Sequence, residues 1–261
     1  MYQHTFVICA YKESKYLEQC IRSLIGQTVK SQIIMVTSTP NDYIYEKAEK
    51  YKIPLFVNEG EKGIAGDWNF GYQCAKTPLV TIAHQDDEYF DKYTEEMLKC
   101  IQNEKKALIY FSNYAEIRNG SIIKKSSLLR IKRMMLIPLK IKKFGDFLFI
   151  KRRILSLGNP ICCPAVTFVV ENLPTKLFRT GFRSNVDWET WEMISRRKGS
   201  FIYNKNILMG HRIHEESETS NVIKDNERVK EDYQMFCKFW PKYIAKILTK
   251  VYANGEKFNE V

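Results

Sequence analysis

The first hundred residues of the chain alternate between short apolar runs and longer segments whose apolar residues recur every three or four positions. The short runs are rich in apolar and β-branched side chains and cover residues 5–10, 32–37, 54–57 and 79–83. Runs of this length predict buried strands. Because segments with helical spacing separate them, the pattern favours a mostly parallel sheet with helices on both faces.

Three helices are expected between these strands. The first places apolar residues on one face, namely Leu17, Cys20, Ile21, Leu24 and Ile25. Ser14 precedes this face and is a candidate amino-terminal cap, because its hydroxyl can accept a backbone hydrogen bond. Residues 43–51 predict the second helix. Residues 67–75 predict the third, with Asp67 as its cap and Pro78 beyond its end.

The second half of the chain is less regular. Asn119-Gly120 is a hairpin signal after a predicted helix and strand. Helices are expected at residues 93–103 and 187–197 and extended segments at 107–113, 165–170, 201–203 and 207–211. A charged helix, interrupted at Pro241, begins near residue 221. We therefore expect an α/β domain over residues 1–220 and a C-terminal helical extension over residues 221–261.

Between residues 118 and 158 the composition changes. Twelve basic residues stand against one acid, Asp146, and leucine, isoleucine, methionine and phenylalanine separate them. We interpret this stretch as a basic amphipathic helical insertion, broken near Pro138 and Gly145. Such a segment can lie on an anionic membrane surface. It can equally pack its apolar residues on the domain and leave its charges in water, so both interpretations remain open.

Composition narrows the class of protein. A hydrophobic share of 44% over 261 residues is typical of a globular chain with a sizeable core. The net charge of +11 favours anionic partners: nucleotide phosphates, acidic glycans, lipid headgroups or nucleic acid. The seven cysteines form no C-x-x-C pair, which predicts reduced core residues and a cytoplasmic location. If the basic segment binds lipid, the protein would sit peripherally on the inner face of the plasma membrane.

The most informative polar residues follow the strand predicted at 79–83. Asp86, Asp87 and Glu88 come where this strand ends, and open α/β sheets bind ligands beyond the carboxyl ends of their strands. Carboxylates held there suit Mg²⁺ or Mn²⁺, which proteins commonly share with substrate phosphates. A polar turn after a core strand is the alternative, and for an Asp-Asp pair alone it is about equally favoured.

Several short motifs occur in an order that resembles the inverting glycosyltransferases of family 2, which have the GT-A fold. The resemblance runs from the first strand to about His214. Val7 to Glu13 resembles the family's first strand and nucleotide-contacting turn, and Gly63, Asn69 and Gly71 its Gly…Asn-x-Gly segment. Gln85-Asp86-Asp87 falls where the family has its Asp-x-Asp metal motif.

The later motifs lie in the second half of the chain. Asn159-Pro160-Ile161 and Pro164 resemble the family's acceptor-side loop. Asp187-Trp188-Glu189 stands where its catalytic carboxylate is expected, and Arg212-Ile213-His214 resembles its Arg-x-His element. The fold implied is α/β of the GT-A (Rossmann-like) type, with a mixed, mostly parallel central sheet flanked by helices.

The resemblance implies a metal-dependent enzyme of polysaccharide biosynthesis. It would transfer a sugar, with inversion, from a nucleotide-diphosphate donor such as a UDP-sugar to a glycan or lipid-linked acceptor. Asp187 would be the catalytic base, and Asp87 and His214 would hold Mn²⁺ or Mg²⁺. The residues expected to bind the nucleotide sugar are Ala10, Tyr11, Glu13, Ser38, Gly63, Trp68, Asn69, Asp86 and Arg212.

Three departures from the family pattern concern the donor. Cys9, Ala10 and Lys12 replace the commoner Pro-Thr and Asn around the first turn. Residues 37–39 are Thr-Ser-Thr where aspartates usually contact the base or ribose, which leaves the nucleotide open. Gln85 replaces the first acid of the metal motif, so metal binding is expected mainly on Asp87.

Alternative roles exist for several of these residues. Asp187 precedes a helical run and could be a cap, which the residues alone favour at about two to one. Trp188 and Trp191 could stack on a sugar ring or belong to the core, with even odds. His211 and His214 are three residues apart, which would also suit a metal pair on a helix. His84 is expected to be structural.

Two other functions remain open. Residues 83–88, Ala-His-Gln-Asp-Asp-Glu, also resemble the Ala-His-Pro-Asp-Asp-Glu motif of zinc-dependent sugar N-deacetylases. In that family the motif follows the first strand, whereas here three predicted strands precede it. The second alternative is a non-catalytic basic protein that binds membrane or nucleic acid. No nucleic-acid-binding signature accompanies the basic segment, so we expect no nucleic-acid partner.

Overall fold

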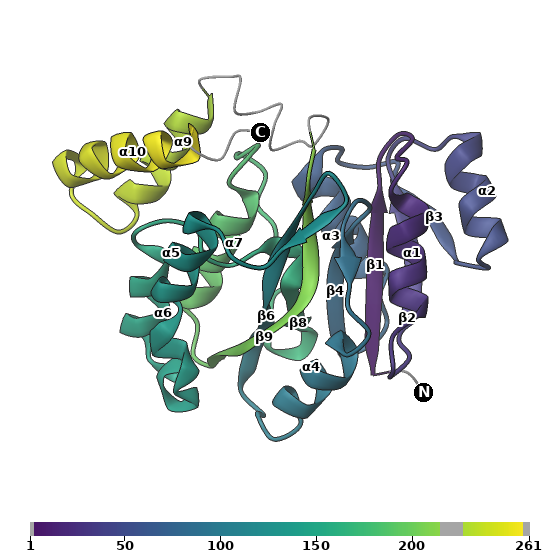
Figure 1. Ribbon diagram of the computed structural model, residues 1–261, viewed down its shortest axis with the longest axis horizontal. Coiled ribbons are helices and arrows are strands. Elements are labelled where there is room, and N and C mark those ends of the chain that lie inside the picture. The colour runs from purple at the N-terminus through teal and green to yellow at the C-terminus, as the bar shows by residue number, and fades with distance from the viewer. Residues whose placement is uncertain (1–2, 215–226, 258–261) are drawn as a thin grey trace.

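The computed structural model describes residues 3–214 and 227–257, which form a mixed α/β structure around one central sheet (Figure 1). Its nine strands have the order β3-β2-β1-β4-β8-β6-β9-β5, and β7 pairs with β6. The strands are β1 His4–Ala10, β2 Gln32–Thr37, β3 Leu55–Val57, β4 Leu79–His84, β5 Glu88–Tyr89, β6 Ala107–Arg118, β7 Ser121–Ile123, β8 Val166–Val169 and β9 Ser200–Ile213.

Most of these strands run in the same direction. β1 pairs with β2 and β4, and β2 pairs with β3, all in parallel. β8 is antiparallel to both β4 and β6, and β6 is parallel to β9, so β6 and β9 run the same way as β4. The carboxyl ends of β1, β2, β4 and β9 therefore lie at one edge of the sheet. The expected mixed, mostly parallel sheet is confirmed.

Helices cover both faces of the sheet. They are α1 Leu17–Ile25, α2 Asp42–Lys50, α3 Ile64–Cys74, α4 Tyr93–Ile101, α5 Ser127–Met135, α6 Leu148–Leu155, α7 Val186–Ser195, α9 Glu227–Cys237 and α10 Lys242–Lys257. Alternation along β1 supplies two cores, because Phe6 and Ile8 pack with α1, α2 and α4 while Val7 packs with α3, α7 and α9. Gly71 lets α3 approach the sheet, since a Cβ there would lie 2.5 Å from Cγ1 of Val7.

Three elements differ from the prediction in their extent or in the residue that caps them. Residues 200–213 form one strand rather than two extended pieces, because β6 pairs along its whole length and absorbs the irregularity as shifts of register near Asn113. α3 begins at Ile64, with Gly63 as its N-cap at φ +96°. Asp67 is therefore inside the helix and does not cap it. Similarly, Tyr16 rather than Ser14 is the N-cap of α1.

The basic segment is helical and broken where the sequence predicts. α5 and α6 are separated by the 3₁₀ helices Ile137–Lys140 (η1) and Lys142–Asp146 (η2), which contain Pro138 and Gly145. Gly145 packs against the sheet, because a Cβ there would lie 2.3 Å from the carbonyl oxygen of Phe201. The segment thus continues the domain rather than standing apart from it.

The C-terminal helices α9 and α10 pack on α6 and α7. The ring of Trp188 lies 5.2 Å from that of Phe236 and 5.7 Å from that of Tyr252, and Arg152 donates to the carbonyl of Lys238. The predicted boundary between residues 220 and 221 lies outside the described residues. Within residues 3–214 and 227–257, no helix combines the length and hydrophobicity needed to span a membrane.

Candidate active site

The turn after β1 and the end of β4 are joined by one side chain. The amide of Gln85 accepts a hydrogen bond from the Tyr11 backbone N–H at 3.0 Å and donates one to the Tyr11 carbonyl at 3.0 Å. Lys12, which follows Tyr11, has φ +52°, and its backbone N–H donates to the hydroxyl of Thr39 at 2.7 Å. Gln85, which replaces an acid of the metal motif, therefore fixes the turn that follows Ala10.

Asp86 and His214 meet at this edge although 128 residues separate them. The Asp86 carboxylate and the His214 Nε2 are 2.9 Å apart, and both side chains are partly exposed. Burial would raise the pKa of Asp86, but the hydrogen bond with His214 and the nearby His84 and His211 hold it below its usual value. The ring of Tyr16 lies 5.1 Å from that of His214. Pairing of β9 in the sheet is what brings these two residues together.

Asp87 points into the protein. Its side chain is fully buried, and its Oδ1 accepts the Arg212 backbone N–H at 2.8 Å and lies 3.0 Å from Nδ1 of His211. Burial would lower the pKa of His211, but the carboxylates of Asp87 and Asp86 raise it above its usual value. Ligand atoms of His84, Asp86 and Asp87 lie within 4.8 Å of one another, a spacing that could hold a metal ion.

The Arg212 guanidinium joins the end of β9 to the metal motif. Its Nε donates to the Asp86 carbonyl at 2.8 Å, and its Nη2 donates to Glu88 and, at 3.1 Å, to the Gln19 side chain. The guanidinium carbon lies 4.3 Å from the centre of the Tyr16 ring. The residue is 5% exposed, and these contacts fix the guanidinium beside the metal motif; its contact with a donor phosphate stays a prediction.

A second polar cluster follows β2. Ser38 donates to one carboxylate oxygen of Asp67 at 2.8 Å, and Asn58 donates to the other at 2.7 Å. The cluster lies between the end of β2 and the start of α3, where Gly63 is exposed. The sequence singled out Ser38 and Gly63 but assigned Asp67 to a cap and missed Asn58. Asn58 carried no local signal, because its bond to Asp67 joins two loops that only the fold brings together.

The remaining donor-side residues have different environments. Tyr11 is 48% exposed, and Glu13 is exposed in the same turn. Trp68 stacks on His84, with ring centres 5.2 Å apart and an interplanar angle of 20°. Tyr11 and Glu13 can therefore meet a ligand directly, whereas Trp68 supports the histidine beside the metal motif.

Asn69 ties α3 to the loop that precedes α7. Its amide accepts the backbone N–H groups of Leu177 and Phe178, both at 2.9 Å, and donates to the Phe178 carbonyl at 2.6 Å. The residue is 5% exposed. These bonds engage both ends of the amide and hold the loop against α3, whereas a contact of Asn69 with the nucleotide sugar stays a prediction.

Asp187 lies in the first turn of α7, whose N-cap is Asn185. Its carboxylate is partly exposed and accepts hydrogen bonds from the Asn159 side chain and the Trp188 N–H, both at 2.7 Å. Burial raises the pKa of Asp187, although these hydrogen bonds oppose the shift. Trp188 and Trp191 are fully buried, so both belong to the core and neither is placed to stack on a sugar.

The short 3₁₀ helix Cys163–Ala165 precedes β8 and, together with its N-cap Cys162, brings two neighbouring cysteines into the loop. Burial raises the pKa of the Cys162 and Cys163 thiols, and the charges of Asp87 and Asp187 both raise it further. Both carboxylates therefore act on the same two thiols, although 100 residues separate Asp87 from Asp187 in the sequence.

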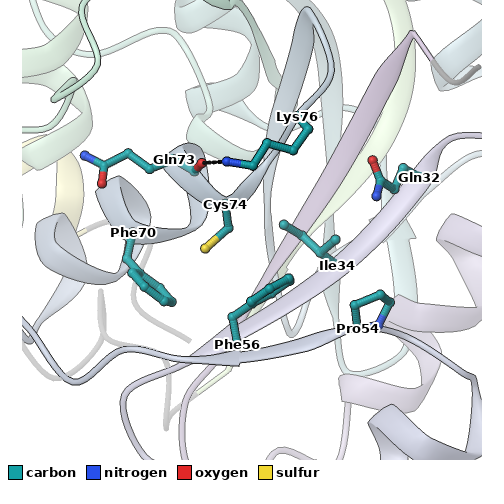
Figure 2. A pocket seen from close by; sticks show the side chains of 8 residues that line it. All are labelled: Gln32, Ile34, Pro54, Phe56, Phe70, Gln73, Cys74 and Lys76. Carbon is teal, nitrogen blue, oxygen red and sulfur yellow. Dashed lines mark hydrogen bonds between the residues drawn. The ribbon is translucent and has the colours of Figure 1, made fainter.

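A cavity of about 320 Å³ lies elsewhere, between β2, β3 and the end of α3 (Figure 2). Figure 2 shows Phe56 and Phe70 on one side of it and Gln32 and Lys76 on another. Gln32 begins β2, whereas the candidate site follows the opposite end of that strand. The cavity is therefore not part of the candidate site.

Solved structures with the same fold are glycosyltransferases. S. aureus TarS in complex with UDP-GlcNAc matches with a TM-score of 0.62 and 14% identity, over 95% of this chain and 70% of that chain. The mannosyltransferase PcManGT from Pyrobaculum calidifontis, with GDP-Man and Mn²⁺, has a TM-score of 0.59 and 13% identity, over 97% of this chain and 70% of that chain. Glucosyl-3-phosphoglycerate synthase from Mycobacterium tuberculosis, with Mn²⁺ and UDP, has a TM-score of 0.56 and 13% identity, over 82% of this chain and 73% of that chain. At such low identity these matches establish the fold.

Comparison of sequences identifies the family. No curated protein matches the chain. The sequence profile of glycosyl transferase family 2 matches residues 5–169, from β1 through β8, which is more than half of the chain. This match decides against the deacetylase alternative, whose motif would follow the first strand, whereas the acids here follow β4. The protein therefore belongs to glycosyl transferase family 2.

Proposed function

We propose that the protein transfers a sugar from a nucleotide-diphosphate donor to a hydroxyl of a glycan or lipid-linked acceptor, with inversion and with a divalent metal ion. The contact between Asp86 and His214 carries this proposal, because it presents an oxygen and a nitrogen ligand side by side at the ligand-binding edge of the sheet. Three solved structures of the same fold contain UDP-GlcNAc, GDP-Man or UDP, which supports a nucleotide-sugar donor.

Asp86 and His214 are the metal ligands that the geometry favours. Both are partly exposed, whereas Asp87, the ligand expected from the sequence, is fully buried. We therefore assign Asp87 the role of holding His211 and the backbone of Arg212 in place. The Asp86 carboxylate suits Mn²⁺ or Mg²⁺, and Mg²⁺ commonly binds through one or two carboxylates together with substrate phosphates. A cation held there would stabilise the negative charge that develops on the departing diphosphate.

Donor binding is assigned to the residues that remain available around the edge. These are the turn after Ala10, with the exposed Tyr11 and Glu13, and the loops that contain Ser38 and Gly63. The Tyr11 ring can stack on a base, and exposed backbone groups of the turn can bond to it. The hydrogen bonds of Gln85 hold this turn at the end of β4, beside Asp86.

Asp187 is assigned as the catalytic base. Inversion in a single displacement requires a group that removes the acceptor proton on the face opposite the leaving group, and a transition state with oxocarbenium character develops as in glycoside hydrolysis. The raised pKa of Asp187 makes its carboxylate a better proton acceptor than an ordinary aspartate. Asn159 and the Trp188 N–H orient the carboxylate and leave it partly exposed to an acceptor.

Isothermal titration with a panel of nucleoside diphosphates, with and without Mn²⁺, tests the metal and donor assignments. Asp86→Asn and His214→Gln should each weaken metal-dependent binding by about 10- to 100-fold, because each removes a ligand. Metal-free binding should change little. Asp91→Asn, which removes an exposed acid five residues further on, is the matched control. Metal-dependent binding by Asp86→Asn as tight as that of the wild type would refute the assignment.

A further inference from the structure

Large apolar side chains gather on the outer surface of the basic segment. Eight of the eighteen exposed large apolar residues of the described chain lie between residues 131 and 157, which is about a tenth of the sequence. We call these eight the apolar face: Ile131, Met134, Ile137, Ile141, Phe147, Leu148, Phe149 and Leu157. Each is about half exposed or more, and Phe149 reaches 65%. A concentration of exposed apolar side chains in one short stretch is typical of a surface that binds a partner or a membrane.

The charges of the segment divide into an inner and an outer set. Lys151 is buried and donates to the carbonyls of Arg197 and Gly199, and Arg152 pairs with Glu192. The exposed basic residues lie among the apolar face, at Arg130, Lys140, Lys142, Lys143 and Arg153. The only acid between residues 118 and 158 is Asp146. The outer surface therefore combines protruding apolar side chains with an excess of positive charge.

Helix α10 repeats this combination. Tyr243, Ile247 and Val251 are four residues apart and 61–70% exposed, so they form one outward stripe. Lys242, Lys246 and Lys250 are exposed beside this stripe, whereas Ala245 and Thr249 are buried. α5, α6 and α10 lie at the same end of the molecule, opposite α1 and α2 (Figure 1). The described chain thus carries a second basic, apolar surface near the first.

The apolar face is held firmly by the core beneath it. On the inner side of α5, Lys132 donates to the Tyr114 hydroxyl at 3.0 Å, and Arg133 donates to Asn113 at 3.1 Å and to the Tyr114 carbonyl at 3.0 Å. Between α5 and α6 lies an apolar groove of about 160 Å³, lined by Met135, Pro138, Ile150, Arg153, Ile154 and Leu157. Because these contacts order the helices, the apolar face needs no folding step before it can bind.

We propose that the apolar face, together with the outward stripe of α10, docks the protein on an anionic lipid bilayer. Apolar side chains can enter the boundary between headgroups and acyl chains, while the surrounding lysines and arginines attract anionic lipids. A second copy of the chain would bring the same excess of positive charge to the interface, which disfavours self-association. Nucleic acid would match the charge but would leave the apolar side chains in water.

Vesicle co-sedimentation of the full chain, without nucleotide or acceptor, tests the proposal independently of sugar transfer. The protein should bind vesicles of equal parts phosphatidylcholine and phosphatidylglycerol, and binding should weaken as salt rises. Vesicles of phosphatidylcholine alone should bind far less. Equal binding to both vesicles, or none to either, would overturn the proposal whether or not the protein transfers sugar.

Matched variants separate this surface from the general charge of the protein. Lys140→Glu with Lys142→Glu and Lys143→Glu lowers the net charge by six, from +11 to +5. The control triple at Lys30, Lys52 and Lys92, also to Glu, makes the same change on exposed residues of the first half. Each basic residue near an anionic surface is worth about fivefold in binding, so the first triple should bind at least about tenfold more weakly than the control. Equal loss in both triples would contradict the proposal.

The apolar contribution has its own pair of variants. Ile141→Ser with Phe149→Ser should reduce binding to anionic vesicles by about tenfold or more, because two protruding apolar side chains are lost. Ile25→Ser with Tyr45→Ser removes side chains that are also 41% and 49% exposed, but far from the basic segment, and should leave binding unchanged. Sedimentation equilibrium completes the test: a dimer that the first pair of variants dissolves would identify a second copy as the occupant and overturn the proposal.

Discussion

The proposed donor side and the proposed acceptor side of the sheet edge differ in how far their polar groups are already bonded to the protein. On the donor side, from β1 to β4, Gln85 pairs with the Tyr11 backbone, and Ser38 and Asn58 both donate to Asp67. On the acceptor side, Asp187 accepts two hydrogen bonds but stays partly exposed, and burial raises its pKa. The polar groups of the proposed donor side are bonded to one another, whereas the proposed acceptor side holds a partly exposed carboxylate with a raised pKa.

The difference indicates which residues are candidates for catalysis and which stabilise the fold. A polar side chain with all its groups bonded to the protein contributes to stability, and its loss leaves buried partners unsatisfied. A carboxylate with a raised pKa and an exposed face is a candidate for catalysis. The following substitutions test this division, beginning with the largest expected effect.

Asp187→Asn should lower turnover by about 10²- to 10⁴-fold, because the amide cannot accept the acceptor proton. Asparagine keeps the size of the side chain, so donor and metal affinity should stay near those of the wild type. The pKa of Asp187 is raised, so turnover of the wild type should fall, as pH decreases, at a higher pH than for an ordinary aspartate. The Asp187→Asn variant should not show this fall in turnover at low pH.

Steady-state kinetics over a range of pH measure both effects once an acceptor is known. Asn159→Ala, which removes a hydrogen bond to the same carboxylate, should lower turnover less than Asp187→Asn. Near-normal turnover by Asp187→Asn would show that Asp187 is structural and not the catalytic base.

Asp87→Ala should destabilise the protein by about 3 kcal/mol, because it leaves the Arg212 N–H and the His211 ring without a buried carboxylate partner. Asp87→Asn should cost less, since an amide oxygen can still accept the N–H. Urea denaturation gives both values. Loss of metal-dependent nucleotide binding by Asp87→Ala at unchanged stability would instead restore Asp87 as the metal ligand that the sequence favours.

Asn69→Ala should lower stability by about 2 kcal/mol, because the backbone N–H groups of Leu177 and Phe178 lose their acceptor. Asn103→Ala, at an exposed residue after α4, is the control and should change little. Thermal unfolding with nucleotide titration separates the two possible roles. A large loss of nucleotide affinity at full stability would show that Asn69 belongs to the donor site after all.

Gln85→Glu should have the smallest effect, about 1 kcal/mol in stability. Glutamate can still accept the Tyr11 N–H but repels the Tyr11 carbonyl to which the amide donates. The turn after Ala10 should then loosen, and nucleoside diphosphate affinity measured by titration should fall by about fivefold. Tighter metal-dependent binding by this variant would mean that position 85 lies close enough to serve as a ligand.

The frame of the first half was largely predictable because its signals are local. Residues 5–10, 32–37 and 79–83 match β1, β2 and β4 to within a residue. A short apolar run between amphipathic helices is typical of a strand that is buried on both faces of a parallel sheet. Pro138 and Gly145 likewise marked the breaks in the basic segment. The position of the acids at the end of β4 followed from the same pattern.

The sequence by itself therefore determined the parallel strands of the first half, the family and the edge at which the acids gather. Only the tertiary structure decided which polar side chain at that edge faces outward. Asp86 and Asp87 are neighbours, yet one meets His214 and the other is buried against Arg212, because β9 arrives from more than 120 residues away. Asn69 is occupied by the backbone near Phe178 for the same reason. Periodicity records which face of an element is buried, but the partner of a polar group depends on contacts between distant segments, which no local pattern contains.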